Sequence, residues 1–524
     1  MKKSLLVLVA GLLLGSGTVL AEEAVVPRFD LQRIFLEGNT ILPADEVARI
    51  LNKYTGSQKD FGTLQEAMDE LEAAYRKRGY TLVTVLLPEQ ELERGTVIFS
   101  VLEPTVKEIV VDGNQHYSRE NILRALPTLK AGQPPKTSAI SENLRAANEN
   151  PGRKLTLQFK SGEKDTDLTA QVKVADQKPW RITLGGDNTG NSSTGYYRTS
   201  LALQHFNLWN RDHVIALQYI TSPDHFEKVQ IGSGSYRLPL YNWGDTLDIF
   251  GAYSDVDSGT VQVSGTDIKV SGKGMISGLR YTMNLPRAAE YQHKLVGGMD
   301  YRSYDNSARQ QGGEDQAKDI VAHPLSLTYG SSWSNEYLSL DASVGLLYNI
   351  PWGHKGEKKD FTSQLKDGNY LISRYGLSAM IRPGADWIVR LAGSGQYSGN
   401  RLIPGEQFGL GGSTSIRGYE EREESWDNGV SGNLELYGPD LGPLLPLSKS
   451  QLRLVGFYDV GYGKNQRPNS FELRDHSISG AGAGVRLGWD EYLSFALDWG
   501  HALNNSTTTR AGDNRIHFKA SVSY

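Results

Sequence analysis

The 524-residue chain contains no cysteine, which excludes disulfide bonds and thiolate chemistry. It also lacks a surplus of positive charge. With 55 basic and 60 acidic residues, its net charge is −5, and we expect no nucleic-acid partner. Beyond the N-terminal leader no run of 18 or more consecutive apolar residues occurs, which excludes helical membrane spans. If the mature chain lies in a membrane, it must cross it as a β-barrel.

Several motifs of enzymes are missing as well. The chain has no GxSxG, no HExxH, no GxxxxGK[ST] loop and no pair of histidines four residues apart, and its ten histidines are scattered. Hydrolase chemistry, zinc catalysis and nucleotide hydrolysis therefore have little support. We expect no enzymatic activity, no metal and no cofactor.

The first 21 residues are typical of a secretory signal peptide. Lys2 and Lys3 precede an apolar run over residues 5–14, and Val19 and Ala21 supply small residues at the −3 and −1 positions of a cleavage site. The alternative is a membrane anchor, but the apolar core is too short to span a bilayer. We predict a signal peptide over residues 1–21 and a short N-terminal segment over 22–28.

A repeat follows, with a constant offset of 75 residues that places Gly38 on Gly113. In the first copy a strand precedes Gly38, a short amphipathic helix follows, and a second helix is expected to start at Thr63 in a capping box with Glu66. Two strands, over 80–87 and 96–102, complete it. The second copy repeats this order, with a helix that opens at Ser118. The pattern predicts two β-α-α-β-β modules, over residues 29–103 and 104–176.

From about Trp180 the helical periodicity ends, and segments with alternating polar and apolar residues continue to the last residue. A soluble β-sandwich also alternates in this way. Aromatic residues at strand ends and a final strand that stops at Tyr524 favour an antiparallel transmembrane barrel, whose last strand pairs with its first. About 345 residues at 21 to 22 per strand and loop give roughly 16 strands. We assign residues 177–524 to this barrel.

A glycine-rich stretch over residues 405–437 has the features of a long loop. It contains the sequence Ile416-Arg417-Gly418-Tyr419, and the strand motif Phe457-Tyr458-Asp459-Val460-Gly461 follows about 40 residues later. After Tyr419 comes an acidic run: Glu420, Glu421, Glu423 and Glu424. We expect this run to be a solvated loop face, with a cation site as the alternative. A flexible surface loop is the simplest interpretation of the stretch as a whole.

These motifs together resemble a known family. Residues 36–40 (LEGNT), 75–80 (YRKRGY) and 150–153 (NPGR), with the loop and strand motifs, are similar to the two-partner secretion transporters, the ShlB/FhaC/HecB-like branch of the outer-membrane assembly superfamily. The resemblance implies tandem periplasmic POTRA domains and a 16-stranded barrel in the bacterial outer membrane. Many members carry an N-terminal plug helix. Here only residues 22–28 precede the first module, which leaves the loop as the candidate for closing the pore.

Strand alternation gives the loop motif a partner. Leu454 and Tyr458 would face lipid, which turns Phe457, Asp459 and Gly461 toward the lumen. A buried carboxylate there needs a partner, and Arg417 can give it two parallel hydrogen bonds. The resemblance implies the same docking of the loop tip on this strand; the alternative is two separate solvated charges. The candidate site comprises Arg417, Gly418, Tyr419, Phe457, Asp459 and Gly461.

The resemblance implies a transporter that secretes a large exoprotein, such as an adhesin or a haemolysin, from the periplasm through its barrel. An insertase that assembles other barrels and a passive porin or ligand channel are the alternatives. The expected partners are the unfolded exoprotein, bound at the edges of the POTRA sheets, and the lipid of the outer membrane. We also expect recognition by the barrel-assembly machinery through the strand that ends at Tyr524, and a monomeric protein.

Overall fold

The computed structural model describes residues 27–91, 95–164, 166–191, 194–255, 258–263, 266–271, 273–305, 319–470 and 472–524. The predicted signal peptide and most of the segment 22–28 lie outside these residues. The chain divides into two compact units: one comprises Met1–Glu108, Lys130–Ser138 and Lys160–Thr169, and the other comprises Ile109–Leu129, Ala139–Phe159 and Ala170–Tyr524. None of the helices in the described part of the chain is long and apolar enough to cross a membrane.

The first module has the predicted order with one additional strand pair. Its elements are β1 (Phe29–Leu31), β2 (Arg33–Glu37), α1 (Ala44–Leu51), β3 (Gly56–Lys59), α2 (Phe61–Lys77), β4 (Thr84–Leu86) and β5 (Thr96–Leu102). The strands form a sheet in the order β2-β5-β4, and β1 pairs with β3. Leu64, Leu71 and Tyr75 of α2 are fully buried in its core.

The predicted start of α2 at Thr63 is wrong. The helix begins at Phe61, and Asp60 is its N-cap: the Asp60 carboxylate accepts a hydrogen bond from the Thr63 backbone N–H at 2.9 Å. Thr63 therefore lies inside the first turn as the donor. An Asp carboxylate is an equally good cap, and its charge also interacts favourably with the N-terminal end of the helix dipole.

The second module contains β6 (Thr105–Asp112), α3 (Arg119–Arg124), α4 (Thr137–Ala147), β7 (Arg153–Ser161) and β8 (Asp167–Asp176), with the sheet order β6-β8-β7. Ser118 caps α3 as predicted, because its hydroxyl accepts from the Asn121 backbone N–H at 3.2 Å. This module contributes residues to both compact units, and α3 belongs to the unit that contains the barrel.

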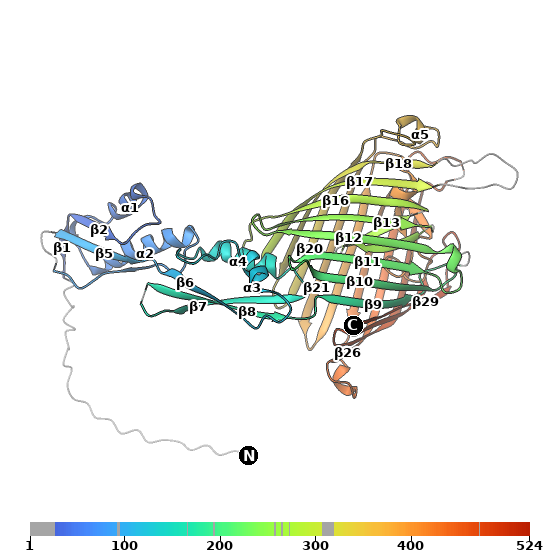
Figure 1. The fold of residues 1–524 in the computed structure, drawn as a ribbon. Helices are drawn as coiled ribbons and strands as arrows, with labels where there is room; N and C mark the ends of the chain where they lie inside the picture. Colours follow the sequence, from blue (N-terminus) through green and yellow to red (C-terminus); the bar gives the residue numbers. More distant parts are fainter. Residues whose placement is uncertain are drawn as a thin grey trace, which may run out of the picture. The chain divides into compact units, whose positions relative to one another are not determined.

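The strands that follow close into an antiparallel barrel (Figure 1). They are β9 (Trp180–Asp187), β10 (Arg198–Leu208), β11 (His213–Thr221), β12 (Gln230–Leu240), β13 (Asp245–Ser254), β16 (Lys273–Asn284), β17 (Tyr291–Asp305), β18 (Ile320–Ala322), β19 (Pro324–Ser334), β20 (Leu338–Asn349), β21 (Leu371–Gly384), β22 (Trp387–Tyr397), β25 (Asn428–Tyr437), β26 (Ser450–Lys464), β27 (Asp475–Trp489), β28 (Leu493–Ala502) and β29 (Asn514–Ser523). Both β18 and β19 pair with β17, so they form one interrupted strand. With these two counted together, the described residues form the 16-stranded barrel that the sequence predicts.

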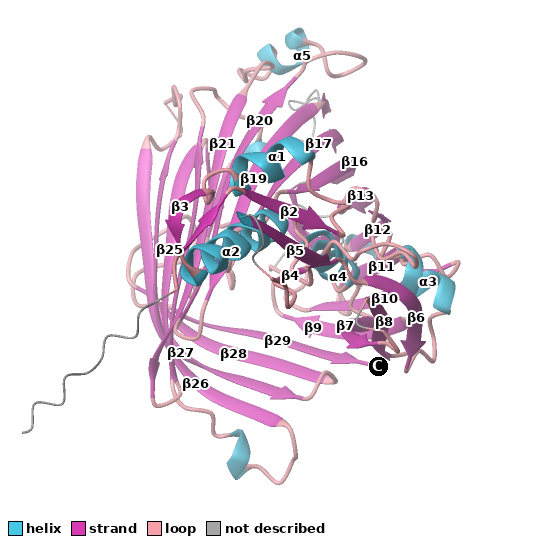
Figure 2. Ribbon diagram, turned by 90° about the vertical axis from the view of Figure 1, so that its left-hand side faces the viewer, coloured by secondary structure: helices cyan, strands magenta, loops and turns pink. Residues whose placement is uncertain are grey.

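The other strands and the other α-helix of the described residues lie in connections between barrel strands. They are the hairpin β14 (Ser258–Val263) and β15 (Thr266–Ser271), the helix α5 (Lys358–Thr362), and the hairpin β23 (Phe408–Leu410) and β24 (Glu424–Trp426). Figure 2 shows α5 beyond the ends of β20 and β21. The other α-helices of the described residues belong to the two N-terminal modules.

The barrel closes where the sequence predicts. β29 pairs antiparallel with β9 from Lys519 opposite Asp187 to Ser523 opposite Thr183, and the C-terminus lies beside β9 in Figure 1. Large apolar side chains are exposed on the outside of many barrel strands. On β26, Leu454 and Tyr458 are exposed while the alternate residues are buried, as expected for an outer face against lipid.

Within the larger unit, the turn between β10 and β11 contacts residues 150–153, which lie in the part of the second module that belongs to this unit. Arg153 of β7 and Asp212 of the turn form a fully buried ion pair at 2.5 Å, and Tyr241 donates to the same carboxylate at 2.8 Å. Burial alone would lower the pKa of Arg153, but the carboxylate of Asp212 raises it above its usual value. Asn150 adds a hydrogen bond of 2.7 Å to the Phe206 carbonyl. The Asn-Pro-Gly-Arg motif is thus fixed to the barrel.

Candidate functional site

The loop between β22 and β25 folds into the barrel. After the short turn Pro404–Glu406, the hairpin β23–β24 carries a tip over residues 411–423. Ile416 and Tyr419 of this tip are fully buried, in a cluster with Leu410, Trp426 and side chains of β27 and β28. A solvated surface loop would leave these apolar side chains exposed, so the interpretation as a flexible surface loop is wrong.

Arg417 and Asp459 meet inside the barrel, as the sequence predicts. The guanidinium Nε donates to Asp459 Oδ2 at 2.7 Å and Nη2 donates to Oδ1 at 2.8 Å. The Arg417 backbone N–H adds a third hydrogen bond to Oδ2 at 3.1 Å. The two residues are 3% and 0% exposed, so the alternative of two separate solvated charges is wrong. A bidentate pair of this kind fixes both the position and the orientation of the loop tip.

The pair belongs to a larger charge network that the sequence analysis missed. Arg417 Nη1 lies 2.8 Å from Glu435 of β25 and 3.5 Å from Asp498 of β28. Two further arginines balance these carboxylates, because Arg390 pairs with Glu435 at 3.0 Å and Arg486 with Asp498 at 2.7 Å. Three cations therefore face three anions.

Two hydrogen bonds extend this network to the backbone of the tip. Asn433 donates to Asp459 Oδ1 at 2.8 Å and to the Ser415 carbonyl at 2.6 Å. His517 of β29 accepts from the Gly418 backbone N–H at 3.1 Å. Strand alternation alone could have suggested these inward positions, but not their common partner.

The remaining candidate residues shape the contact. The ring of Phe457 lies under the guanidinium of Arg417, 3.5 Å from its central carbon to the ring centroid, a cation–π geometry. Gly418 has φ = 102° and lies against the backbone of β28, where a side chain would be strained and crowded. At Gly461 a Cβ atom would come within 2.7 Å of Leu410. The Tyr419 hydroxyl lies 2.9 Å from the carbonyl oxygens of both Ser479 and Asn504.

The acidic run after Tyr419 is not a solvated face, so that prediction is wrong. Glu423 accepts hydrogen bonds from the backbone N–H groups of Thr508 and Thr509 and from the Thr509 hydroxyl, at 2.6 to 2.8 Å. The other three carboxylates contact partners as follows: Glu420 with Arg515, Glu421 with Ser413, and Glu424 with His476 and Ser506. In the described residues no group of His, Asp and Glu is arranged to hold a metal ion. The run anchors the loop to its neighbours.

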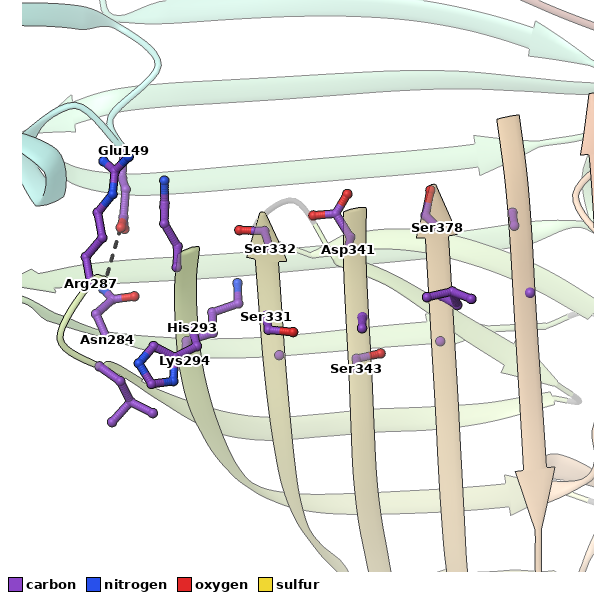
Figure 3. Close-up of a pocket in the computed structure, with 18 of the residues that line it drawn as sticks. Glu149, Asn284, Arg287, His293, Lys294, Ser331, Ser332, Asp341, Ser343 and Ser378 are labelled. Atoms are coloured by element: carbon purple, nitrogen blue, oxygen red, sulfur yellow. Dashed lines mark hydrogen bonds between the residues drawn. The ribbon is translucent and has the colours of Figure 1, made fainter. Parts of the chain in front are cut away.

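A cavity of about 570 Å³ lies inside the barrel, at the end nearest α4 (Figure 3). Figure 3 shows Glu149, two residues after α4, directed at Asn284 of β16, with which it shares a hydrogen bond of 3.5 Å. Small inward-facing hydroxyls line one side of the cavity: Ser332 on β19, Ser343 on β20 and Ser378 on β21.

The two three-stranded sheets of the N-terminal modules have edge strands, each of which pairs within its sheet on one side alone. These edge strands are β2 and β4 in the first module and β6 and β7 in the second.

Comparisons with known proteins agree with this architecture. A family model described as haemolysin secretion/activation protein ShlB/FhaC/HecB matches residues 168–487, and a model of the ShlB-type POTRA domain matches residues 29–104. The heme/hemopexin transporter protein HuxB of Haemophilus influenzae is 23% identical over 485 residues, which cover 90% of this chain and 83% of HuxB. The hemolysin transporter protein ShlB of Serratia marcescens is 26% identical over 407 residues, or 76% of this chain and 70% of ShlB.

Among solved structures, CdiB from Escherichia coli superposes with a TM-score of 0.77 at 19% sequence identity, over 96% of this chain and 92% of that chain. At this identity the likeness concerns the fold: tandem small modules followed by a closed barrel.

Proposed function

The chain belongs to the haemolysin secretion/activation family ShlB/FhaC/HecB, and on this premise we propose that it moves one large exoprotein, still unfolded, from the periplasm to the cell surface. It is an outer-membrane transporter of the two-partner secretion type, with its POTRA region in the periplasm. The observation that carries the proposal is the loop bound inside a closed barrel through Arg417 and Asp459. A passive porin has no need of such a built-in occupant or of periplasmic modules.

Capture of the exoprotein takes place at the sheet edges of the POTRA modules. An extended segment can add itself as a strand to β2 or β4 of the first module, or to β6 or β7 of the second. Main-chain hydrogen bonds supply the affinity, so the segment needs no folded structure of its own. On the edge strand β2, Phe35 is 47% exposed and offers an apolar contact beside those hydrogen bonds.

Passage through the barrel begins at the cavity beside α4. Its wall of Ser332, Ser343 and Ser378 offers hydroxyl groups that can both donate and accept hydrogen bonds, which suits a polypeptide backbone of any sequence. Arg287 and Lys294 also line the cavity and add positive charge. Folding of the exoprotein outside the cell gives transport its direction, so no step on the route requires a nucleotide or a chemical change of the substrate.

Assembly of the transporter itself uses its last strand. We propose that β29, whose outer face carries Ile516 and Val522 and which precedes the exposed Tyr524, is recognised by the barrel-assembly machinery. The protein then works as a monomer, because one barrel contains both the loop and the passage. Native electrophoresis of the detergent-extracted protein should give a single species of monomer mass.

Secretion tests the proposal directly. A large secreted protein encoded beside this gene is produced in a Gram-negative host with and without the transporter, and the medium is assayed for it. We expect export only when both proteins are present. Equal release in the absence of the transporter contradicts the proposal. Export of unrelated periplasmic proteins of any size would instead indicate a porin, and a fall in other outer-membrane barrels on deletion would indicate an insertase.

A further inference from the structure

Ion pairs on the inner wall of the barrel expose their two partners unequally. In five of them an arginine of one strand contacts a carboxylate of a neighbouring strand or of the loop: Arg237–Asp248, Arg280–Asp300, Arg374–Glu406, Arg390–Glu435 and Arg486–Asp498. The side chains of the five arginines are 25% to 44% exposed, whereas none of the five carboxylates exceeds 9%. The wall therefore turns its guanidinium groups toward the lumen and keeps the carboxylates behind them.

The strand register explains why these pairs lie inside the barrel. Residues opposite each other in an antiparallel strand pair share one face of the sheet. Asp248 of β13 is opposite Arg237 of β12 on one side and opposite Arg280 of β16 on the other, so the three form one inward row. Arg390 of β22 is opposite Glu435 of β25, which also contacts the loop tip in the lumen. The five arginines lie on β12, β16, β21, β22 and β27 and are thus spread around the wall.

Two ion pairs at the turns of the barrel show the opposite order. Arg453 pairs with Asp386 and Arg181 pairs with Glu491, and in both pairs the carboxylate is more than half exposed while the arginine is less exposed. Both carboxylates lie on turns between strands, where water can surround them. Exposure of the arginine is therefore a property of the five pairs on the lumen wall and not of every ion pair in the barrel.

The cavity at the end nearest α4 has the same bias. Basic side chains outnumber carboxylates in its lining by four to two: Arg145, Arg287, Lys294 and Arg390 against Glu149 and Asp341. Arg390 belongs both to this lining and to the five pairs of the wall. A chain that enters the barrel from this end therefore meets positive charge first and guanidinium groups along the way.

A partly exposed guanidinium offers hydrogen-bond donors and no acceptor. The buried carboxylate takes some of its N–H groups, and the others face the lumen. The strongest partners for these donors in a polypeptide are the carboxylates of Asp and Glu side chains. Each such contact in water is weak and screened by salt, so a chain that is bound at several points can still move on.

We propose that the inner wall is a track of guanidinium groups for the carboxylate side chains of the exoprotein, and that the segment which enters the barrel carries an excess of Asp and Glu. The inference rests on the proposed transport function, because it names the chemical class of the substrate in the same passage. A segment rich in Lys would instead meet like charge in the cavity and along the wall.

Binding of synthetic peptides to the purified full-length protein in lipid nanodiscs tests this without any exoprotein. Three fluorescent peptides of equal length alternate Ser with Asp, with Asn or with Lys, and fluorescence anisotropy gives each Kd at low salt. We expect the Asp peptide to bind at least about tenfold more tightly than the Lys peptide, with the Asn peptide between them. This preference should shrink as the salt concentration rises from about 0.05 to 0.3 M.

The variants Arg374→Gln and Arg390→Gln assign the preference to the wall. We expect each to weaken binding of the Asp peptide about threefold, as for loss of one exposed ion pair, and to leave binding of the Asn peptide unchanged. Both variants should fold, because neither leaves a buried carboxylate without a cation. The second arginines are within 2.8 Å: Glu406 keeps Arg302, and Glu435 keeps Arg417.

The matched control is Arg510→Gln, an exposed arginine on the loop between β28 and β29, which should bind all three peptides as wild type does. Each variant is first checked for a folded barrel by heat-dependent migration in electrophoresis. Arg486→Gln replaces a lumen variant that fails this check, because its partner Asp498 keeps Arg417 at 3.5 Å.

The outcomes separate the track from other sources of binding. Equal binding of the Asp and Lys peptides overturns the inference, and so does an equal loss in Arg510→Gln. A preference that both lumen variants retain also overturns it, because the acidic peptide then binds elsewhere. Loss of the preference in Arg374→Gln and Arg390→Gln alone supports it. If the peptides show this pattern while the secretion assay fails, the proposed cargo is wrong and the track stands.

Discussion

The wall of the barrel formed by β25 to β29 and the wall formed by β19 to β21 differ in what their inward side chains do. On the first wall, Glu435, Asp459, Asp498 and His517 all contact Arg417 or its neighbour Gly418. On the second wall, near α4, small hydroxyls such as Ser343 and Ser378 point inward and line a cavity. The first wall binds the tip of the loop, and the second leaves space at its end near α4.

This difference shows how one lumen can be both occupied and passable. Buried charges of opposite sign require fixed partners, and so they specify a single docked position for the loop. Hydroxyl groups on small side chains have no such requirement and accept many different backbones in turn. Substitutions on the two walls should therefore impair secretion in different ways.

The largest effect is expected at the loop tip. Arg417→Ala leaves three buried carboxylates short of a cation, and Asp459→Ala removes the bidentate acceptor; loss of one partner of a buried pair typically costs about 3–5 kcal/mol. We expect secretion to fall below roughly a tenth of wild type in both variants while the protein still inserts. The measurement is exoprotein in the medium, with barrel content of outer membranes as the reference.

Arg382→Lys, on an inward position of β21 without a buried carboxylate, is the control for that experiment and should secrete normally. Normal export by both Arg417→Ala and Asp459→Ala would show that secretion does not require the loop tip to be bound to the wall formed by β25 to β29.

A bulky residue on the passage wall should have the next largest effect. Ser343→Trp places an indole in the cavity, and we expect secretion to fall roughly threefold because the passage narrows, while loop docking is retained. Val344→Trp is its neighbour on the same strand but faces outward, where the side chain is 50% exposed, and should be tolerated. Equal secretion by the two variants would show that the exoprotein does not pass along β20.

A smaller effect is expected where the loop packs on β26. In Gly461→Ala the new Cβ would lie 2.7 Å from Leu410, and relief of such overpacking typically costs about 1–3 kcal/mol. Thermal unfolding of the barrel should shift to lower temperature, with secretion reduced but present. Gly456→Ala on the same strand meets no atom within 4 Å and serves as the control. A stable, fully active Gly461→Ala would mean that the loop packs loosely.

The smallest effect is expected outside the barrel, at the capture step. Phe35→Ala on the edge strand β2 removes an exposed apolar side chain but leaves the backbone edge intact, so we expect the secretion rate to fall about twofold. Secretion rates at low exoprotein expression measure this, and Phe61→Ala, an equally exposed aromatic on α2 in the same module, is the control. An equal loss in both variants would argue against capture at β2.

The features that the sequence predicted well are those with short-range patterns. Alternation from Trp180 onward, the last strand ending at Tyr524 and the repeat around Gly38 and Gly113 are all local signals, and they led to the strand number and the closure of the barrel. The pairing of Arg417 with Asp459 was accessible because an inward carboxylate on a barrel strand needs a counter-charge.

The features that the sequence did not predict depend on distant partners. The sequence indicated a solvated Glu423, because the residues that donate hydrogen bonds to its carboxylate, Thr508 and Thr509, lie about 85 residues later in another loop. Glu406 belongs to none of the sequence motifs, and the two arginines that donate hydrogen bonds to it, Arg302 and Arg374, lie on strands far away in the sequence. The start of α2 was misplaced for a local reason, because Asp60 and Thr63 can both cap a helix and only the geometry distinguishes them.

The hydrogen bond from Gly418 to His517 has a consequence for the order in which the molecule is built. It joins residues 99 positions apart, and His517 lies on β29, which follows every other described barrel strand in the chain. Contacts of such long sequence separation form late, since loop-closure entropy must be overcome before they contribute. The loop tip thus cannot reach its final site until the C-terminal strand has emerged and taken its place beside β9. Docking of the loop tip is therefore a late step of biogenesis, which follows the closure of the barrel wall.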